Sequence, residues 1–230
     1  MGTPRLVWCA DGNKSHSVMA SGLGWLYGAR LPAKGLADLP LYFADQDWKR
    51  PDRKKYMTCL ATHRPNICTV LDWEREEQYR EVISWVEEAA QYVSTAVLVV
   101  PKVAGIVGRI PRRVGNKDVW LAYSVPTRYG GTTVPVEEFY GRSVHLLGGS
   151  PQSQISCWES LQHFSSVESA DGNMSKKMAT QRCCYWTRLP TSRYGHWQPL
   201  ARSVEKNAPD ECLRRSLKNI LDAWDRIGKR

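Results

Sequence analysis

Short apolar runs alternate with longer amphipathic or loop-like segments along most of the chain. Runs that are apolar throughout, without strict alternation, are typical of strands buried on both faces of a parallel sheet. The pattern predicts such strands at Arg5–Ala10, Leu39–Ala44, Asn66–Leu71, Ala96–Val100, Asp118–Ser124, Ser143–Leu147 and Ser165–Ala170.

Helices are predicted between these strands from apolar residues at three- and four-residue spacing. The pattern is clearest at Glu74–Tyr92 and in the last helix, which we place at residues 209–227 because Pro209 suits a first helical position. Ser15–Pro32 contains several glycines and is interpreted as helix and loop. Further helices are predicted at Pro51–Arg64, Val136–Tyr140 and Ser153–Phe164.

The repeated order of strand and helix predicts a parallel α/β fold in one domain over residues 1–230. We expect a compact (β/α)8 TIM-type barrel with incomplete or modified strands, its eighth strand near Ile106–Ile110. An open, doubly wound sheet uses the same alternation. The glycine-rich signatures of the two commonest nucleotide-binding versions are absent from the sequence.

The formal net charge of +9 favours a polyanionic partner, first of all nucleic acid. A basic-aromatic segment, residues 176–202, contains no acidic residue. Cations for phosphates beside flat rings for bases are typical of a nucleic-acid groove. The candidate nucleic-acid-binding residues are Lys176, Lys177, Arg182, Arg188, Arg193, Trp186 and Trp197.

Seven scattered cysteines, an odd number in a long chain, favour reduced thiols in a cytoplasmic protein. The sequence has no apolar run of membrane-spanning length, and its N-terminal apolar stretch is too short for a signal peptide. We therefore expect no membrane partner.

Each predicted strand ends in a reactive or conformationally permissive residue. In a parallel barrel all carboxyl ends of the strands meet at one mouth, where the active site is built. Asp11 is best interpreted as the cap of a turn, whereas Asp45, Asp72 and Asp171 directly follow apolar runs and are interpreted as functional. The candidate residues at the mouth are Asp11, Asp45, Asp72, Lys102, Ser124, Gly148, Gly149 and Asp171.

Two carboxylates across a pocket suit chemistry at an anomeric carbon, because one attacks or stabilises that carbon while the other moves a proton. A third carboxylate can accept hydrogen bonds from a guanine-like N1–H and amino group. Gly148 and Gly149 would let backbone approach a ligand closely. The alternative for both the Gly-Gly and the Asp171-Gly172 pairs is an ordinary turn.

Five segments in this order resemble the tRNA-guanine transglycosylase superfamily. They are FADQDW (43–48), TVLDW (69–73), WLAYSVP (120–126), VHLLGGSP (144–151) and SVESADGNMSKKMA (166–179). The resemblance covers about Leu39 to Ala179 and is closest to the phage-type DNA branch, which inserts 7-deazaguanine bases such as preQ0 into DNA. It also implies a (β/α)8 barrel.

The resemblance implies a role for each carboxylate. Asp171 would attack C1′ of the target nucleoside and hold a covalent glycosyl intermediate. Asp45 would be the general acid and base for the leaving and entering bases, and Asp72 would bind the N1–H and amino edge of the base.

The resemblance also implies a substrate-binding surface around these carboxylates. Tyr123 and Ser124 would contact the base, and Gly148 and Gly149 would form the floor of the pocket next to the ribose or phosphate. Lys102 and Asp11 complete the candidate substrate-binding set because each follows a predicted strand.

The tRNA enzymes of this superfamily carry a zinc site made by three closely spaced cysteines and a distant histidine. The corresponding region here has only the adjacent Cys183 and Cys184, with His196 and Cys212 further along. Adjacent cysteines rarely bind one metal with good tetrahedral geometry. We therefore expect no zinc and no other cofactor, and we interpret His145 and His163 as packing or surface histidines.

The function that we expect is exchange of guanine in DNA for a free 7-deazaguanine base, with the target base flipped or in single-stranded DNA. The enzyme would work in the cytoplasm, that of the host if it is phage-encoded, and a homodimer is a further expectation. Three alternatives stay open: a non-catalytic nucleic-acid-binding protein, a hydrolase of N-glycosidic bonds, and a transglycosylase that acts on tRNA.

Overall fold

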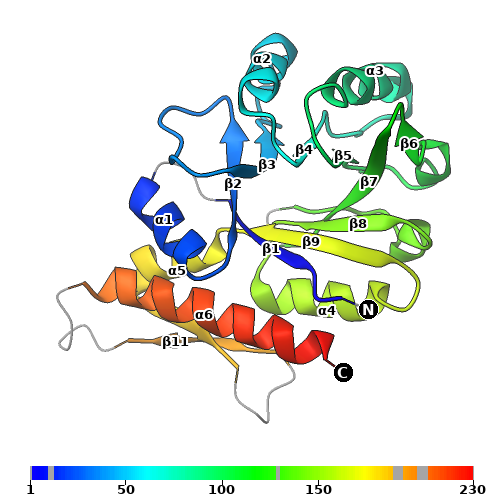
Figure 1. Cartoon of the computed structure of the whole chain (residues 1–230). Coiled ribbons are helices and arrows are strands. Elements are labelled where there is room, and N and C mark those ends of the chain that lie inside the picture. The colour runs from blue at the N-terminus through cyan, green and yellow to red at the C-terminus, as the bar shows by residue number, and fades with distance from the viewer. Residues whose placement is uncertain (1, 10–12, 128–129, 189–193, 201–206, 230) are drawn as a thin grey trace.

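The apolar runs of the sequence form one parallel sheet in the computed structural model, which describes residues 2–9, 13–127, 130–188, 194–200 and 207–229 (Figure 1). Each strand of this sheet pairs with the next, and the last pairs with the first, so eight described strands close into a barrel. In barrel order they are β1 (Arg5–Cys9), β2 (Leu26–Leu31), β3 (Leu41–Gln46), β4 (Ile67–Thr69), β5 (Ala96–Val99), β7 (Lys117–Ser124), β8 (Ser143–Leu147) and β9 (Ser166–Gly172). The predicted TIM-type barrel is therefore confirmed.

The position of the eighth strand differs from the prediction. It is β2, inside the stretch interpreted as helix and loop, whereas Ile106–Ile110 contains the 3-10 helix η2 (Val107–Arg109). Gly28 obscured the strand pattern of β2. A Cβ at Gly28 would lie 2.8 Å from Val7 Cγ1 and 3.2 Å from Phe43 Cδ1, so the barrel interior requires a glycine there.

Helices cover the outside of the barrel, and side chains cap several of them. Asn13 and Asp52 accept hydrogen bonds from the first turns of the helices that follow them, and Ser150 does the same before Pro151. All five segments predicted as helices are helical, with ends that differ by a few residues from the prediction. The predicted helix at Val136–Tyr140 is the 3-10 helix η3, and the one at Glu74–Tyr92 begins with the 3-10 helix η1. The helices are α1 (Lys14–Gly22), α2 (Arg53–His63), η1 (Glu76–Gln78), α3 (Tyr79–Ala89), η3 (Val136–Phe139), α4 (Pro151–Leu161), α5 (Met174–Arg182) and α6 (Ala208–Gly228).

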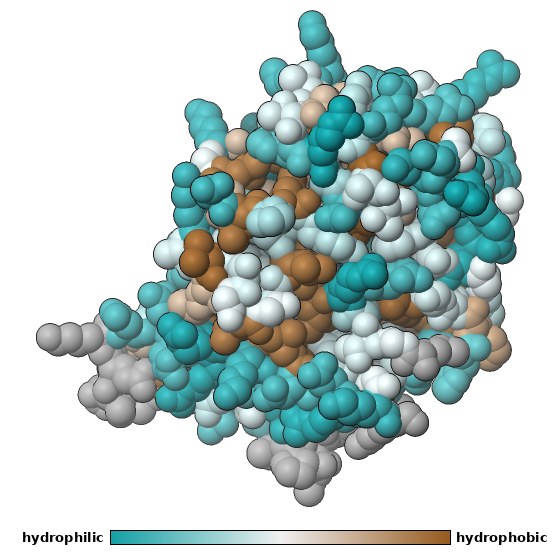
Figure 2. Space-filling view, viewed as in Figure 1, coloured by the Kyte–Doolittle hydropathy of each residue, from teal (hydrophilic) through white to brown (hydrophobic). Residues whose placement is uncertain are grey.

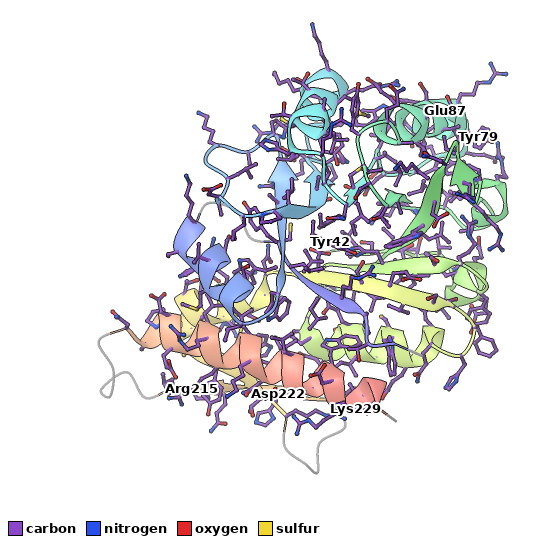
Figure 3. The ribbon with its side chains drawn as sticks, viewed as in Figure 1. Tyr42, Tyr79, Glu87, Arg215, Asp222 and Lys229 are labelled. Carbon is purple, nitrogen blue, oxygen red and sulfur yellow. The ribbon has the colours of Figure 1, made fainter. Side chains whose placement is uncertain are left out.

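Two apolar clusters form the core, one on each side of the sheet. The smaller fills the barrel and includes Val7, Phe43 and Leu98, with Tyr42 also inside (Figure 3). The larger lies between the sheet and the helices and includes Trp8, Leu121 and Trp224. The outer sides of α2, α3 and α6 are hydrophilic, as Figure 2 shows at the top and bottom of the view. Burial on both faces explains why the strand sequences are apolar throughout.

Two small β elements lie outside the barrel. The strand β6 (Arg113–Val114) pairs antiparallel with the start of β7. The hairpin of β10 (Cys184–Thr187) and β11 (His196–Pro199) follows α5 and packs against α6. In the described part of the chain, no helix has the length and apolar character needed to cross a bilayer.

Candidate active site

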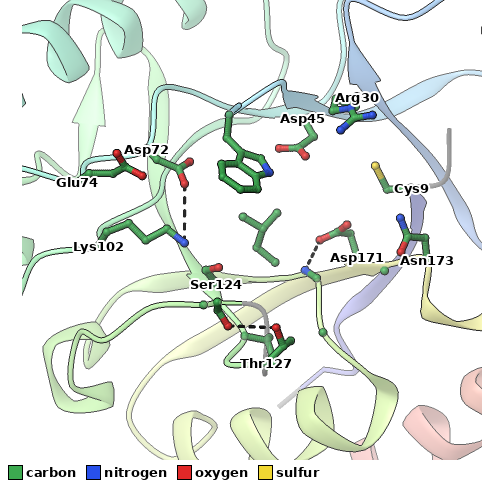
Figure 4. Close-up of a pocket in the computed structure, with 18 of the residues that line it drawn as sticks. Cys9, Arg30, Asp45, Asp72, Glu74, Lys102, Ser124, Thr127, Asp171 and Asn173 are labelled. Atoms are coloured by element: carbon green, nitrogen blue, oxygen red, sulfur yellow. Dashed lines mark hydrogen bonds and ion pairs between the residues drawn. The ribbon is translucent and has the colours of Figure 1, made fainter. Parts of the chain in front are cut away.

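A cavity of about 650 Å³ opens at the carboxyl ends of the barrel strands (Figure 4). All three predicted carboxylates line it, and Figure 4 shows Asp45, Asp72 and Asp171 projecting into it. Asp45 lies on β3, Asp72 in the loop after β4, and Asp171 on β9. Most predicted mouth residues are therefore brought together as expected. The predicted residues that line the cavity are Asp45, Asp72, Lys102, Ser124, Gly148, Gly149 and Asp171.

The carboxylate of Asp171, at the end of β9, is held through one oxygen. Its Oδ1 accepts hydrogen bonds from the backbone N–H of Gly148 at 2.8 Å and from Nε2 of His145 at 3.2 Å. Among the described residues Oδ2 has no hydrogen-bond partner. Asp171 is buried but lines the cavity. The side chain is thus fixed in orientation while its second oxygen is available to a substrate.

His145 contacts Asp171 from the interior of the barrel. It is fully buried inside the barrel, and its Nδ1 lies 2.7 Å from Oγ of Ser169. With a proton assigned to Nε2 and none to Nδ1, the ring accepts from Ser169 and donates to Asp171. The ring packs on Phe43, with 4.9 Å between ring centroids. The interpretation of His145 as a packing residue was therefore incomplete, because alternation along β8 places it on the inner face next to the carboxylate.

Asp45, at the end of β3, is in a different electrostatic environment. Its Oδ1 accepts a hydrogen bond from Thr69 Oγ1 at 2.8 Å, and that hydroxyl in turn accepts from the N–H of Gln46. Burial, followed by the charge of Asp171, raises the pKa of Asp45 to about 7, although the Thr69 hydrogen bond opposes this. A large share of the Asp45 side chains is therefore protonated at neutral pH.

Asp72 and Lys102 form an ion pair on another side of the cavity, with Nζ 3.8 Å from Oδ2 (Figure 4). Burial raises the pKa of Asp72 to about 6, and Lys102 opposes that rise while Glu74 adds to it. Both side chains are largely buried yet line the cavity. The pair offers a hydrogen-bond acceptor beside a donor to any planar polar ligand.

Gly148 and Gly149 shape the floor of the cavity through backbone conformations that favour glycine. Their φ angles are 69° and 85°. Gln154 of α4 donates to the carbonyls of both Gly148 and Asp171, so it ties the glycine turn to the end of β9. From this turn the backbone N–H of Gly148 donates to Asp171. The two glycines therefore orient the carboxylate as well as making room.

Two other predicted substrate-binding residues have different outcomes. Ser124 lines the cavity, but Tyr123 does not. Successive residues of β7 point to opposite faces, so Tyr123 lies in the outer layer and packs edge-on against Phe139 at 4.9 Å. The prediction that Tyr123 contacts a base is wrong. Asp11 lies outside the described residues.

Several lining residues were missed by the sequence analysis. Arg30 lies at the carboxyl end of β2, so recognising β2 in the sequence would have identified Arg30 as a candidate. Cys9 is the last residue of β1, and Asn173 directly follows β9. Trp48 lies at the rim and is 56% exposed. Only Trp48 carried a signal, because it stands three residues after Asp45 in a polar loop.

The described part of the basic-aromatic segment contributes no residue to the cavity. Trp186 is fully buried against α6, and its Nε1 donates to Gln152, so the prediction that it stacks on a base is wrong. Trp197, its cross-strand partner, is partly buried. Lys177 and Arg182 are exposed on α5, Lys176 and Arg188 are partly buried, and Arg193 lies outside the described residues.

The residues considered for zinc differ in their burial. Cys183 and Cys212 are buried, while Cys184 is partly buried and His196 is exposed. Among the described residues no group of three or more His, Cys, Asp or Glu side chains could hold a metal ion.

Residues 20–225 match the model of DUF6610, described as a family of unknown function. The chain belongs to this family. The DUF6610 match includes every cavity residue from Arg30 onward and leaves out Cys9. No curated protein and no solved structure matches the chain. The chemistry of the cavity is therefore the basis on which a function can be proposed.

Proposed function

We propose that this protein exchanges a base at an N-glycosidic bond in DNA, releasing guanine and inserting a 7-deazaguanine such as preQ0. The observation that carries the proposal is a pair of carboxyl groups in one cavity with different surroundings. Asp171 accepts two hydrogen bonds through one oxygen, whereas Asp45 has a pKa of about 7. Such a pair provides a nucleophile and an acid in one cavity. The sequence resemblance to the transglycosylases supports the same assignment.

In the first step Oδ2 of Asp171 attacks C1′ of the flipped nucleotide. The bond between C1′ and the guanine nitrogen breaks, and Asp45 gives its proton to the departing base. The product is a glycosyl ester on Asp171 and a free guanine. His145 and the N–H of Gly148 hold the attacking carboxylate in place.

In the second step the incoming 7-deazaguanine gives the proton of its reacting nitrogen to the ionised Asp45. That nitrogen attacks C1′ and expels Asp171 as a carboxylate. Two displacements at one carbon preserve its configuration. Since the bond made resembles the bond broken, the exchange needs no ATP or redox cofactor and is reversible.

In this proposal Asp72 and Lys102 bind the base. The Asp72 carboxylate can accept from the N1–H and amino group of guanine, and Lys102 can donate to its carbonyl oxygen. Ser124 lies on the same side of the cavity (Figure 4) and adds a hydroxyl. The 7-deazaguanine keeps this polar edge, so the same contacts would serve both bases.

The DNA partner is supported by the net charge of +9 and by exposed cations on α5, namely Lys177 and Arg182. Trp48 and Lys49 add an exposed ring and a cation at the cavity rim, 5.2 Å apart. We place the enzyme in the cytoplasm, where the seven cysteine thiols would stay reduced.

The experiment is incorporation of labelled guanine or preQ0 into duplex DNA, single-stranded DNA and tRNA. The parent is compared with Asp171→Asn, Asp171→Ala and the control Asp225→Asn, which changes an exposed carboxylate on α6. We expect label in DNA with the parent and the control only. We also expect a covalent protein–DNA adduct that survives denaturation and requires Asp171.

Each other outcome identifies an alternative. Release of free guanine without incorporation would make the protein a hydrolase. Incorporation into tRNA alone would keep the mechanism and change the substrate. A folded, DNA-binding parent that neither releases nor incorporates any base would leave only a binding protein.

A further inference from the structure

A second cavity, of about 480 Å³, opens at the opposite end of the barrel. It is formed where β8 and β9 begin, beside Gly2 near the N-terminus (Figure 1). Two arginines, Arg112 and Arg142, line it together with His163 and Phe164. None of these residues lines the cavity that contains Asp171. The second cavity is therefore a separate site with its own chemistry.

Arg142 carries a buried charge that no carboxylate compensates. Only 7% of its surface is exposed. Its guanidinium donates to three carbonyl oxygens: Nη1 to Ile110 at 3.1 Å, and Nη2 to Pro111 at 3.1 Å and Val119 at 3.4 Å. Among the described residues it forms no ion pair. Carbonyl groups satisfy hydrogen bonds but bring no negative charge, and an unpaired buried ion is costly.

Arg112 places a second positive charge at the same cavity. Its Nη1 donates to the carbonyl of Gly141 at 2.7 Å, and within the described chain this is the one hydrogen bond of its side chain. Burial, and then the charge of Arg112, lower the pKa of Arg142. In the described part of the chain no Asp or Glu lines this cavity. Glu168, on β9 just beyond the lining residue Val167, accepts from Ser143 and Ser166. Two cations thus converge without a counter-ion.

We propose that this second cavity binds a phosphate group. A guanidinium presents parallel N–H donors that match phosphate oxygens, and two guanidiniums match the charge of a phosphate dianion. The cavity has room for more than the anion. Phe164 is 57% exposed on its wall and stacks on Tyr140 at 4.4 Å, which would suit a planar group attached to the phosphate. The ligand is inorganic phosphate or a mononucleotide.

The test is the dissociation constant of inorganic phosphate, measured by thermal unfolding against chloride at equal ionic strength. Matched chloride is needed because a basic protein binds all anions weakly. Binding to the folded protein alone raises the unfolding temperature with ligand concentration. We compare the parent with Arg112→Gln, which is exposed, and with Arg113→Gln. Arg113 is the adjacent residue, but it pairs with Asp118 at 3.4 Å and does not line the cavity.

We expect the dissociation constant to rise at least tenfold in Arg112→Gln and to stay within twofold in Arg113→Gln. Guanosine monophosphate and guanosine are then tested in the same way. Tighter binding of the monophosphate than of phosphate, lost in Arg112→Gln, would identify a nucleotide site. Binding of phosphate alone would identify a site for the free anion. An equal response to phosphate and chloride in the parent, or an equal loss in both variants, would overturn the proposal.

Discussion

At the scale of single residues, Asp45 and Asp171 are chemically identical side chains with different surroundings. Asp171 receives two hydrogen bonds on one oxygen. Asp45 receives one, from Thr69, and lies close enough to Asp171 for that charge to disfavour its own ionisation. Like charges in a shared cavity separate the proton affinities of two carboxyl groups. The proposed division of labour between nucleophile and acid rests on this difference.

The pH dependence of the first chemical step is the most direct consequence. Asp45 must be protonated to give a proton to the leaving base, and its pKa is about 7. We therefore expect kcat/KM for guanine release to fall about tenfold for each pH unit above that value. Single-turnover release across pH 5–9 measures it. A rate that keeps rising through pH 8 would exclude Asp45 as the acid.

Asp45 also makes folding stability depend on pH. Its folded pKa, about 7, lies above its ordinary value of 3.8, so ionisation costs stability progressively as the pH rises from 3.8 to 7. Asp45→Asn removes this cost while still accepting from Thr69. We expect the unfolding temperature of the variant to exceed that of the parent, and by more at pH 8 than at pH 5. Each kcal/mol of unfolding free energy gained corresponds to a rise of roughly 2–4 °C. Asp225→Asn, exposed on α6, should show no such difference.

In the proposed mechanism His145 acts through Asp171, so its substitution should affect the rate of guanine release more than substrate binding. His145→Phe preserves the packing on Phe43 and removes the hydrogen bond to Asp171. We expect guanine release to slow roughly 100-fold, because a misplaced reactive group loses about that much. KM should change little. Partial recovery in His145→Gln, which can donate again, would separate positioning from simple packing, and an unchanged rate in His145→Phe would contradict the role.

At the scale of elements, the turn between β8 and α4 positions the chemistry. Its two glycines have positive φ, and Gln154 on α4 binds the carbonyl oxygens of Gly148 and Asp171. Ser150 then caps α4 before Pro151. Strand, turn and helix thus form one unit that fixes the N–H donated to Asp171.

Substitution of Gly149 tests whether this strand–turn–helix unit is needed to orient Asp171. A Cβ there would lie 2.5 Å from Val125 Cγ1, at a φ of 85° that side chains rarely adopt. We expect Gly149→Ala to lower the free energy of unfolding by roughly 2 kcal/mol or more and to reduce guanine release beyond the loss of folded protein. Denaturant unfolding and the release assay measure the two effects. Gly22→Ala, where a Cβ would meet nothing within 4 Å, is the control and should be neutral or slightly stabilising.

At the scale of the whole molecule, the barrel separates two faces with different charges. Carboxylates dominate the cavity at the carboxyl ends of the strands, and arginines dominate the one at the amino ends. The β10–β11 hairpin lies against α6, outside the barrel wall. Figure 3 shows Arg215, Asp222 and Lys229 along α6 on its side away from the barrel. Nucleic acid that reaches Asp171 would therefore meet the cavity rim before it meets the hairpin.

Two tryptophans, Trp186 in the β10–β11 hairpin and Trp48 at the cavity rim, should differ in their effects on stability and DNA binding. Trp186 is fully buried, so Trp186→Ala should cost about 3–5 kcal/mol of folding free energy. Trp48 is 56% exposed at the cavity rim, so Trp48→Ala should change stability by less than about 0.5 kcal/mol and weaken single-stranded DNA binding. Denaturant unfolding and fluorescence anisotropy measure these effects. Unchanged DNA affinity in Trp48→Ala would remove the rim from the DNA path.

The sequence by itself determined the parts of this protein that depend on local pattern. Continuous apolar runs identified seven strands, and the residue after three of them placed Asp45, Asp72 and Asp171 at one mouth, since parallel strands end at the same face. Only the tertiary structure decided what depends on neighbours distant in the chain. It revealed β2, whose glycine fits around Val7 and Phe43.

Side-chain direction and electrostatic environment also came from the tertiary structure alone. Tyr123 and Trp186 face away from the cavity, because packing against Phe139 and α6 decides their direction. The pKa of Asp45 depends on the charge of Asp171, which the closed sheet brings close. Arg112 and Arg142 converge for the same reason. Local sequence encodes which residues end a strand, but closure of the barrel decides which charges meet.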